Sequence, residues 1–420
     1  MAADQQAQSG QGRRAGDPGR LHIAFVVPGF VLDRDDPGMP AVVDLVERVA
    51  AVHDCDVVAL RYPPAPRPYR VAGARVRSLG PARFGGVLGR AAVLSRGVRA
   101  VVAIDRRHRI DVIHGLWADE PGAVAAIAGR LLRRPVVVSV MGGELARLPD
   151  IGYGAALGRG GRWTTAIALR DADLVTAGSR QAVASVARRG LAAPRLLLAP
   201  LGVDVATFHP EGGTPTGSRA TDAAKMADAV PETPKTTVLF VGSLEPVKDP
   251  ASALGVFANL AADRPRLRLE IVGDGRLRDG LTGLAEALGI RDRVRFLGQL
   301  PRSEMPGRYR GASILLVTSR HEGQSMVAVE AAACGTPVVG TRVGILPDLG
   351  SAAITVRVGD EGGLARAAAR VIDDPALAAT MGAAGRAAAV ARYALDRTVR
   401  DAMENYAAVV SSGFGPSSGR

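Results

Sequence analysis

The chain of 420 residues is poor in cysteine and in aromatic residues, with only Cys55 and Cys334 and an aromatic content of 4%. Two cysteines cannot form the disulfide framework of a small secreted domain, which favours a reducing compartment. No apolar run reaches the ~18 residues of a membrane-spanning helix, and the first 20 residues lack the apolar segment of a secretory signal. We therefore expect a cytoplasmic protein, long enough for two or three domains.

Acidic residues are nearly absent from one segment. Residues 61–110 contain twelve arginines and a single acidic residue, Asp105. A surface of one sign attracts anionic lipids or acidic ligands, so the segment suggests a peripheral contact with an anionic membrane. The chain has three lysines against fifty arginines. A codon bias that places arginine at ordinary solvent-exposed positions is therefore the simpler interpretation of this basic segment. Nucleic acid is not an expected partner, because only Tyr62, Tyr69 and Phe84 offer stacking surfaces in this segment.

Short apolar runs alternate with helical patterns along most of the chain. In the first half, strands are expected at residues 21–27, 56–60, 111–114, 135–140, 174–177 and 196–199. Residues 211–235 have no apolar periodicity and many Gly, Pro, Thr and Asp. The alternation then restarts, with strands expected at residues 237–241, 267–272, 294–297, 314–317 and 337–340. This pattern predicts an α/β protein with two doubly wound, Rossmann-like domains of parallel strands facing across a cleft.

The expected domain boundaries follow from these changes in composition. They are a disordered N-terminus (1–20), a first domain (21–210), a flexible linker or insert (211–235), a second domain (236–392), a C-terminal helix that packs back on the first domain (393–410) and a disordered tail (411–420).

The most informative stretch is residues 318–340, TSRHEGQSMVAVEAAACGTPVVG. A strand is expected to lead into a loop with Glu322 and Gly323, and a helix is expected to begin near Ser325. Free N–H groups and the positive end of the helix dipole suit a phosphate at such a position. Glu322 and Glu330 are expected near the same helix end, and their carboxylates suit the vicinal hydroxyls of a sugar or ribose.

This stretch resembles the signature of retaining, nucleotide-sugar-dependent glycosyltransferases of the GT-B fold, family 4 or glycosyl transferases group 1. The family pattern is a glutamate, a Gly-rich loop, a second glutamate eight residues on, and Ala-x-Ala-x-Gly-x-Pro-Val-Val. The matching positions in this chain are Glu322, Gly323, Glu330, residues 331–333, Gly335, Pro337, Val338 and Val339. Weaker matches are residues 241–244 with Lys248, residues 271–275, and residues 201–204 with Phe208 and Pro210.

The resemblance implies a hexosyltransferase of glycan, glycolipid or other glycoconjugate biosynthesis. A hexose would move from a UDP- or GDP-linked sugar to the hydroxyl of a glycan, a lipid-linked acceptor or a small molecule, with retention and by a front-face route. The catalytic residues it implies are Glu322, Lys248 and His114. Those around the donor are Gly242, Ser243, Lys248, Gly273, Glu322, Gly323, Gln324, Ser325, Met326, Val327 and Glu330, and those on the acceptor side are Gly29, Gly38, His114, Gly142 and Glu144.

Two departures from the family pattern keep other functions open. Ser243 stands where an arginine is common, and Met141 where a histidine often faces the reacting sugar. Arg320 and Arg342 are candidate substitutes for the missing arginine. The alternatives are a nucleotide-sugar-binding protein of the same fold that has lost catalysis, or a nucleotide-sugar epimerase. No cofactor or metal ion is expected, because three scattered Asp-x-Asp pairs are not joined by a cluster of His, Cys or carboxylate residues.

Overall fold

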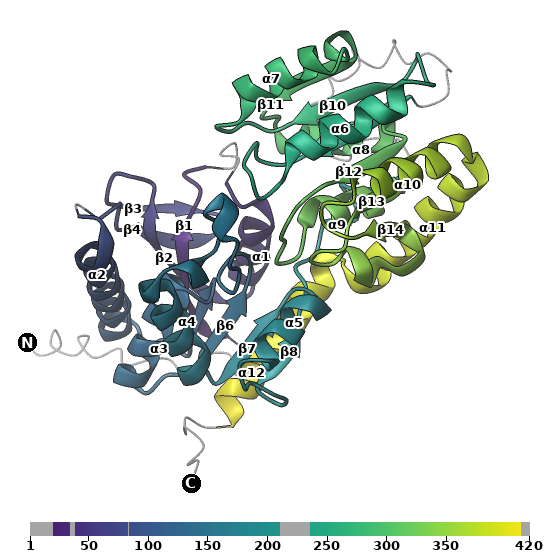
Figure 1. Cartoon of the computed structure of the whole chain (residues 1–420). Coiled ribbons are helices and arrows are strands. Elements are labelled where there is room, and N and C mark those ends of the chain that lie inside the picture. The colour runs from purple at the N-terminus through teal and green to yellow at the C-terminus, as the bar shows by residue number, and fades with distance from the viewer. Residues whose placement is uncertain (1–19, 34–37, 83, 211–235, 413–420) are drawn as a thin grey trace, which may run out of the picture.

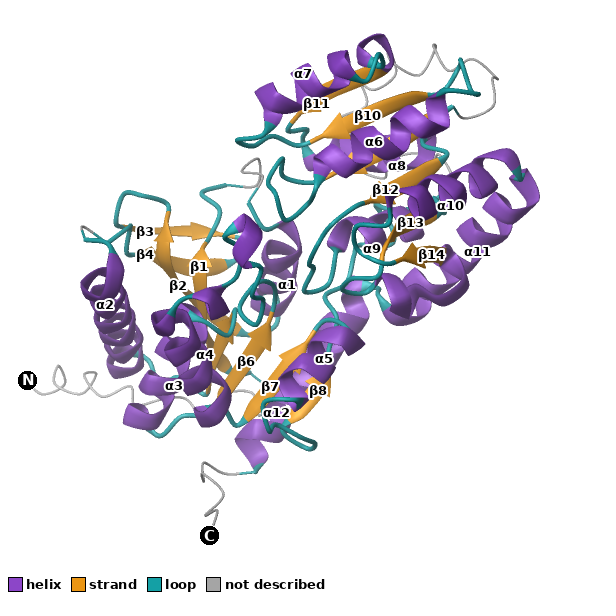
Figure 2. Cartoon of the chain, viewed as in Figure 1, coloured by secondary structure: helices purple, strands orange, loops and turns teal. Residues whose placement is uncertain are grey.

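The computed structural model describes residues 20–33, 38–82, 84–210 and 236–412. Its strands form two separate sheets, which Figure 1 shows in two lobes, one purple to teal and the other green. Figure 2 shows helices on both faces of each orange sheet. The prediction of two Rossmann-like α/β domains is confirmed.

The first sheet has the strand order β3-β4-β2-β1-β5-β6-β7-β8. Its strands are β1 (His22–Gly29), β2 (Asp54–Tyr62), β3 (Arg67–Val71), β4 (Ala74–Ser78), β5 (Val112–Leu116), β6 (Val136–Val140), β7 (Leu174–Ala177) and β8 (Leu196–Leu198). All described pairs are parallel except β3 with β4, which form an antiparallel hairpin at the edge. The sequence analysis missed this hairpin. The chain between β2 and β4 is too short for the crossover helix of a parallel unit, so it turns back on itself.

The second sheet is parallel throughout the described residues, in the order β11-β10-β9-β12-β13-β14. Its strands are β9 (Thr237–Val241), β10 (Arg268–Val272), β11 (Val294–Gly298), β12 (Ile314–Val317), β13 (Val338–Thr341) and β14 (Ala353–Val356). β14 lies at the edge and is another strand that the sequence analysis missed. Because all strands run the same way, the loops that follow β9, β10 and β12 meet at one edge of this sheet.

Helices cover both faces of both sheets. They are α1 (Pro40–Ala50), α2 (Gly86–Arg107), α3 (Glu120–Leu132), α4 (Arg159–Asp171), α5 (Arg180–Ala187), α6 (Pro250–Ala261), α7 (Arg278–Ala287), α8 (Met305–Gly311), α9 (Met326–Ala333), α10 (Glu361–Asp373), α11 (Pro375–Arg392) and α12 (Leu395–Ser411). Helices α2 to α5 pack on one face of the first sheet, and α1 and α12 on the other. In the second domain, α6, α7 and α10 cover one face, and α8, α9 and α11 the other.

The chain crosses between the two domains at two adjacent places. Helix α11 belongs to the second domain, whereas α12, yellow in Figure 1, inserts Tyr406 and Val409 into the core of the first. At the crossing, Val203 forms an isolated parallel bridge with Ala394. A side chain at Gly202 would lie 2.6 Å from the Ala394 backbone, so the two crossing segments are in contact.

Some predictions fall on residues that the structure leaves undescribed. These are the N-terminal segment up to residue 19, the linker or insert at 211–235, and the tail from residue 413. Within the described ranges, no helix combines the length and apolar character that crossing a membrane requires.

Candidate functional site

The candidate donor site lies where three loops of the second domain meet. Residues 242–249 follow β9, Gly273 follows β10, and residues 318–325 follow β12. Gly273 has φ of +126°, and a Cβ there would lie 2.0 Å from the Gly242 carbonyl oxygen. Only glycine fits at position 273, and this allows the loop after β10 to lie against the loop after β9.

Lys248 and Glu322 form an ion pair at the centre of these loops. The Lys248 Nζ atom lies 2.7 Å from Glu322 Oε1, and the same oxygen accepts a 2.7 Å hydrogen bond from the Ser319 hydroxyl. The Glu322 side chain is 9% exposed and that of Lys248 28%. The structure therefore places an ammonium group and a carboxylate, 74 residues apart in sequence, at one partly open position.

Helix α9 begins beside this ion pair, with Ser325 as its N-cap. Ser325 has φ of +85°, a left-handed backbone conformation that residues other than glycine rarely adopt. Its hydroxyl is buried and has no hydrogen-bond partner within the described part of the chain. Gln324, Met326 and Val327 flank it, as the sequence predicts for the helix start. The arrangement offers a hydroxyl and a positive helix end to an anion.

Glu330 lies one turn further along α9 and is buried. Its Oε2 atom accepts a 2.7 Å hydrogen bond from the Tyr309 hydroxyl of α8. Burial raises the pKa of Glu330, and the tyrosine hydrogen bond opposes this shift. Tyr309 thus positions one of the two carboxylates that the sequence analysis expected to bind the hydroxyls of a sugar or ribose.

The first domain presents its own loops at the carboxyl ends of its strands. Gly29 ends β1, Gly38 precedes α1, and Gly142 follows β6. Glu144 is 2% exposed, and its carboxylate accepts hydrogen bonds from three backbone N–H groups, those of Ala118 (3.0 Å), Met141 (2.8 Å) and Gly142 (2.6 Å). A direct contact of Glu144 with an acceptor does not fit this burial, and its role is to fix the loop after β6.

The resemblance implies a catalytic, acceptor-side role for His114, but the structure buries this residue within the first sheet. It lies within β5, it is 4% exposed, and its Nδ1 and Nε2 atoms are 2.7 Å from the Tyr406 hydroxyl and 2.8 Å from Ser139 Oγ. Burial lowers its pKa to about 3, so the ring is neutral at ordinary pH. His114 joins the sheet to α12, and both of its ring nitrogens are taken up by these contacts.

Loop 318–325 also holds the two domains together. The Gln324 side-chain amide accepts from the Leu201 N–H (2.8 Å) and donates to its carbonyl oxygen (2.7 Å). Ser179 donates a 2.8 Å hydrogen bond to the Gly323 carbonyl oxygen. A Cβ at Gly323 would lie 2.1 Å from the Met141 carbonyl oxygen, so glycine is required for this approach. The sequence indicated Gln324 and Gly323 as donor residues but not this interdomain role.

Two further side chains near the cleft carry perturbed pKa values that the sequence analysis missed. Burial, with smaller contributions from Glu144 and Glu120, raises the pKa of Asp119 to about 7. Burial, with contributions from Glu322 and Glu144, raises that of Tyr153 to about 12. Trp117, two residues before Asp119, has φ of +79°, which marks this turn after β5 as strained.

The two arginines expected to substitute for the one absent at Ser243 lie in other surroundings. Arg320 forms a 2.6 Å ion pair with Asp150 of the first domain. Arg342 is exposed at the end of β13. Lys248 is therefore the cation that the structure places at the centre of the site.

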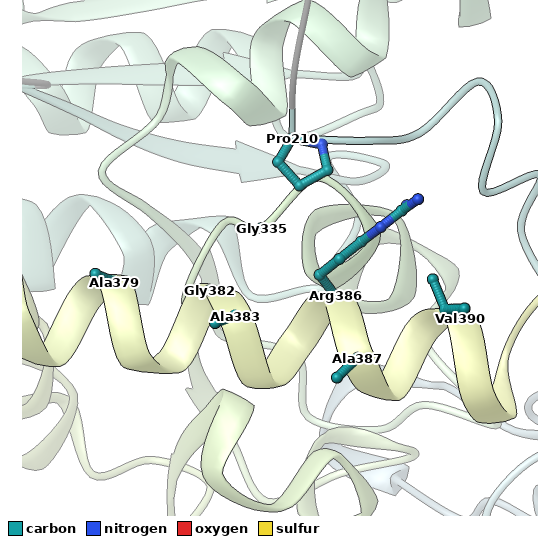
Figure 3. Close-up of a pocket in the computed structure, with 8 residues that line it drawn as sticks. All are labelled: Pro210, Gly335, Ala379, Gly382, Ala383, Arg386, Ala387 and Val390. Carbon is teal, nitrogen blue, oxygen red and sulfur yellow. The ribbon is translucent and has the colours of Figure 1, made fainter.

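No group of three His, Cys, Asp or Glu side chains within the described ranges is arranged to hold a metal ion. A separate pocket of about 560 Å³, shown in Figure 3, lies along α11 and is lined mostly by alanine and glycine. Its Arg386 guanidinium donates to the carbonyl oxygens of Val205, Phe208 and Ala333. This arginine is bound to backbone and belongs to the crossing region, not to the candidate site.

Family models match both halves of the chain. Glycosyl transferase 4-like domain matches residues 40–202, and glycosyl transferases group 1 matches residues 222–388. The second match contains Lys248, Glu322 and Glu330.

Curated relatives include D-inositol 3-phosphate glycosyltransferases. That of Corynebacterium jeikeium is 37% identical over 193 residues, covering 44% of this chain and 45% of the relative. That of Thermomonospora curvata is 33% identical over 265 residues, covering 59% of each chain. The chain spans about half the length of the curated relatives it matches.

Solved structures share the fold at low sequence identity. Sucrose-phosphate synthase from Thermosynechococcus elongatus has a TM-score of 0.76 at 23% identity, covering 94% of this chain and all of that one. Anabaena Alr3699/HepE in complex with UDP-glucose has a TM-score of 0.69 at 20% identity, covering 93% of this chain and all of the other. With a glycosyl transferase 4-like domain followed by a domain of glycosyl transferases group 1, this chain belongs to the GT-B glycosyltransferases.

Proposed function

We propose that this protein transfers a hexose from a nucleoside-diphosphate sugar to an acceptor hydroxyl, with retention of configuration and without a metal ion. One observation carries the proposal: Lys248 and Glu322 form an ion pair in the loops that precede α9, and the Ser325 hydroxyl at the N-cap of this helix has no hydrogen-bond partner among the described residues. An ammonium group, a hydroxyl and free N–H groups stabilise the charge of a departing diphosphate. In this proposal Glu322 accepts hydrogen bonds from sugar hydroxyls, and Glu330 accepts them from the ribose.

The proposed reaction needs no group beyond the two substrates and these side chains. The acceptor oxygen forms a bond to the anomeric carbon on the face from which the diphosphate departs. The bond from that carbon to the phosphate oxygen breaks, and its electron pair stays on the diphosphate. The proton of the acceptor hydroxyl passes to that phosphate oxygen.

The relatives narrow the proposed substrates. Alr3699/HepE has been solved with UDP and with UDP-glucose, which favours a UDP-linked donor over a GDP-linked one. The curated relatives are named for D-inositol 3-phosphate, which favours a small phosphorylated polyol over a glycan as the acceptor.

A binding and transfer assay tests the donor side. Melting temperatures are measured with UDP, GDP, ADP and TDP and their hexose conjugates, with and without magnesium or a chelator. A ligand at about a hundred times its Kd stabilises the folded state by ~2.7 kcal/mol. We expect a shift with UDP or UDP-hexose that the chelator leaves unchanged, followed by transfer to inositol 3-phosphate.

The same assay separates the alternatives. A nucleotide-sugar-binding protein would show the shift but transfer nothing to any acceptor. An epimerase would convert the sugar without an acceptor. No shift with any nucleotide would contradict the donor site itself.

A peripheral membrane contact is a second proposal, for the start of α2. Phe84, Val87 and Leu88 are 67%, 81% and 74% exposed, and arginines surround them in sequence. Exposed apolar side chains within a basic segment favour an anionic surface. Co-sedimentation with phosphatidylglycerol vesicles at low salt, lost in F84S/L88S, is the expected result, and equal binding by both proteins would contradict it.

A further inference from the structure

The first domain contains a second cavity, outside the candidate donor site. It has a volume of about 610 Å³, within the usual range of small-molecule sites, ~300–1,000 Å³. The hairpin β3–β4 and the C-terminal end of α2 form its walls, with Arg70, Arg75, Arg77, Arg107 and His108 in the lining. Asp56, near the start of β2, also lines it, so the cavity lies toward the amino ends of the strands, away from loop 318–325.

Three of these arginines share one face of the hairpin. Arg70 is paired directly opposite Arg75, and Arg77 lies two residues beyond Arg75 on the same strand. Side chains two residues apart, or directly opposite, project from the same face of a sheet. Like charges placed directly opposite one another destabilise a sheet.

The Asp56 carboxylate neutralises the charge of only one arginine that lines the cavity, Arg75. Asp56 Oδ2 lies 2.7 Å from Arg75 Nη2 and also 2.7 Å from the Nε2 atom of buried His22. Within the described residues, no carboxylate forms an ion pair with Arg70, Arg77 or Arg107. Asp56 thus fixes Arg75 as a wall of the cavity and leaves three guanidinium groups there without a counter-charge.

The remaining walls give the cavity an apolar side. Pro68, paired opposite Arg77, and Ile104 of α2 line it together with the arginines, whereas the side chains of Tyr69 and Val76 pack into the core on the other face of the hairpin. His108 stacks on His22 with ring centroids 4.4 Å apart, which fixes the end of α2 against the sheet. Guanidinium groups beside apolar and ring surfaces match a ligand that combines phosphate groups with an organic body.

We propose that this cavity binds a small soluble molecule bearing two or more phosphate groups, held by Arg70, Arg77 and Arg107. The site is independent of the proposed transfer reaction, since its lining residues all belong to the first domain and Lys248 belongs to the second. It is also distinct from the exposed apolar start of α2: the helix has 22 residues, and at ~1.5 Å per residue its two ends are roughly 33 Å apart.

Titration calorimetry with inorganic tripolyphosphate tests the site. Saturating UDP is included to occupy the donor site. The test variant is R70Q/R77Q, and the matched control is R266Q/R366Q, which removes two exposed arginines of the second domain. R107Q is a second test variant on the helix side, in case the change in the hairpin prevents folding.

We expect one tripolyphosphate per chain, with affinity reduced at least tenfold in R70Q/R77Q, reduced in R107Q, and unchanged in R266Q/R366Q. Equal affinity in all four proteins, or no binding to the wild type, would overturn the proposal. Phosphatidylglycerol vesicles form the second arm. Vesicle binding that depends on Arg70 and Arg77, without tripolyphosphate binding, would assign the cavity to a lipid headgroup and overturn the soluble ligand.

Discussion

Ser325 gives the sharpest test of the candidate donor site, because its conformation and its hydroxyl both destabilise the unliganded protein. A left-handed backbone conformation destabilises any residue other than glycine by ~1–2 kcal/mol. Ser325 has such a conformation, with φ of +85°. A buried hydroxyl without a partner costs ~1–3 kcal/mol, and the Ser325 hydroxyl has none among the described residues. Ser325→Ala removes the second cost and Ser325→Gly removes both.

We therefore expect Ser325→Ala to raise the free energy of unfolding by ~1–2 kcal/mol, and Ser325→Gly to raise it by roughly 1 kcal/mol more. Urea unfolding without ligand measures both. If the hydroxyl binds the donor diphosphate, both variants lose about tenfold in donor affinity, which corresponds to ~1.4 kcal/mol. The donor Kd from calorimetry supplies this value.

The pair of variants also shows how the reasoning could fail. A loss of stability in Ser325→Ala would mean that the hydroxyl has a partner in the folded protein. Gained stability with unchanged donor affinity would mean that Ser325 destabilises the fold without binding the donor.

Three further predictions concern Lys248, Asp119 and His114. Lys248→Met should leave Glu322 without its cation. In steady-state assays we expect kcat/KM for the donor to fall by about a hundredfold, ~2.7 kcal/mol. Lys248→Arg keeps the positive charge and should recover part of the lost kcat/KM. Because burial raises the pKa of Asp119 to about 7, the folded state keeps a proton that the unfolded state releases near pH 4. The stability of wild type relative to Asp119→Asn should thus fall by roughly 2–4 kcal/mol between pH 4 and 7 and stay level above; a constant difference from pH 4 to 8 in urea titrations would contradict this. His114→Gln should lower the melting temperature, because the contact with Tyr406 is lost. The kcat per folded molecule should stay within about twofold of wild type, ~0.4 kcal/mol. A loss of kcat without a loss of stability would instead indicate a catalytic role for His114.

The second domain could be predicted from sequence because its chemistry is local. Residues 318–330 hold the loop, the helix start and both glutamates in one continuous segment, and the strand before it ends where the apolar run ends. Lys248 had to come from another loop, yet parallel strands bring their carboxyl ends together whatever their separation in sequence. Local pattern and topology were therefore sufficient to bring these residues together.

The site residues of the first domain were harder to predict from sequence. Their contacts are made either with residues far away along the chain or with backbone N–H groups. His114 is buried by Tyr406, which follows it by 292 residues, so no pattern around His114 could indicate that it is covered. Glu144 has its carboxylate bound to backbone N–H groups, a contact that any glutamate near a turn could make. The β3–β4 hairpin did leave a signal, because Arg70, Arg75 and Arg77 alternate with apolar residues.

Loop 318–325 contacts both domains, and this has a consequence for how the protein would work. Glu322 is bonded to Lys248 on the donor side, while Gly323 and Gln324 are bonded to Ser179 and Leu201 of the first domain. Opening the domains would break these hydrogen bonds and release the same loop that positions Glu322. A donor that requires the loop in its observed conformation must therefore favour closure, by as much as its affinities for the two states differ. Donor binding and the assembly of the acceptor side are thus coupled through three consecutive residues.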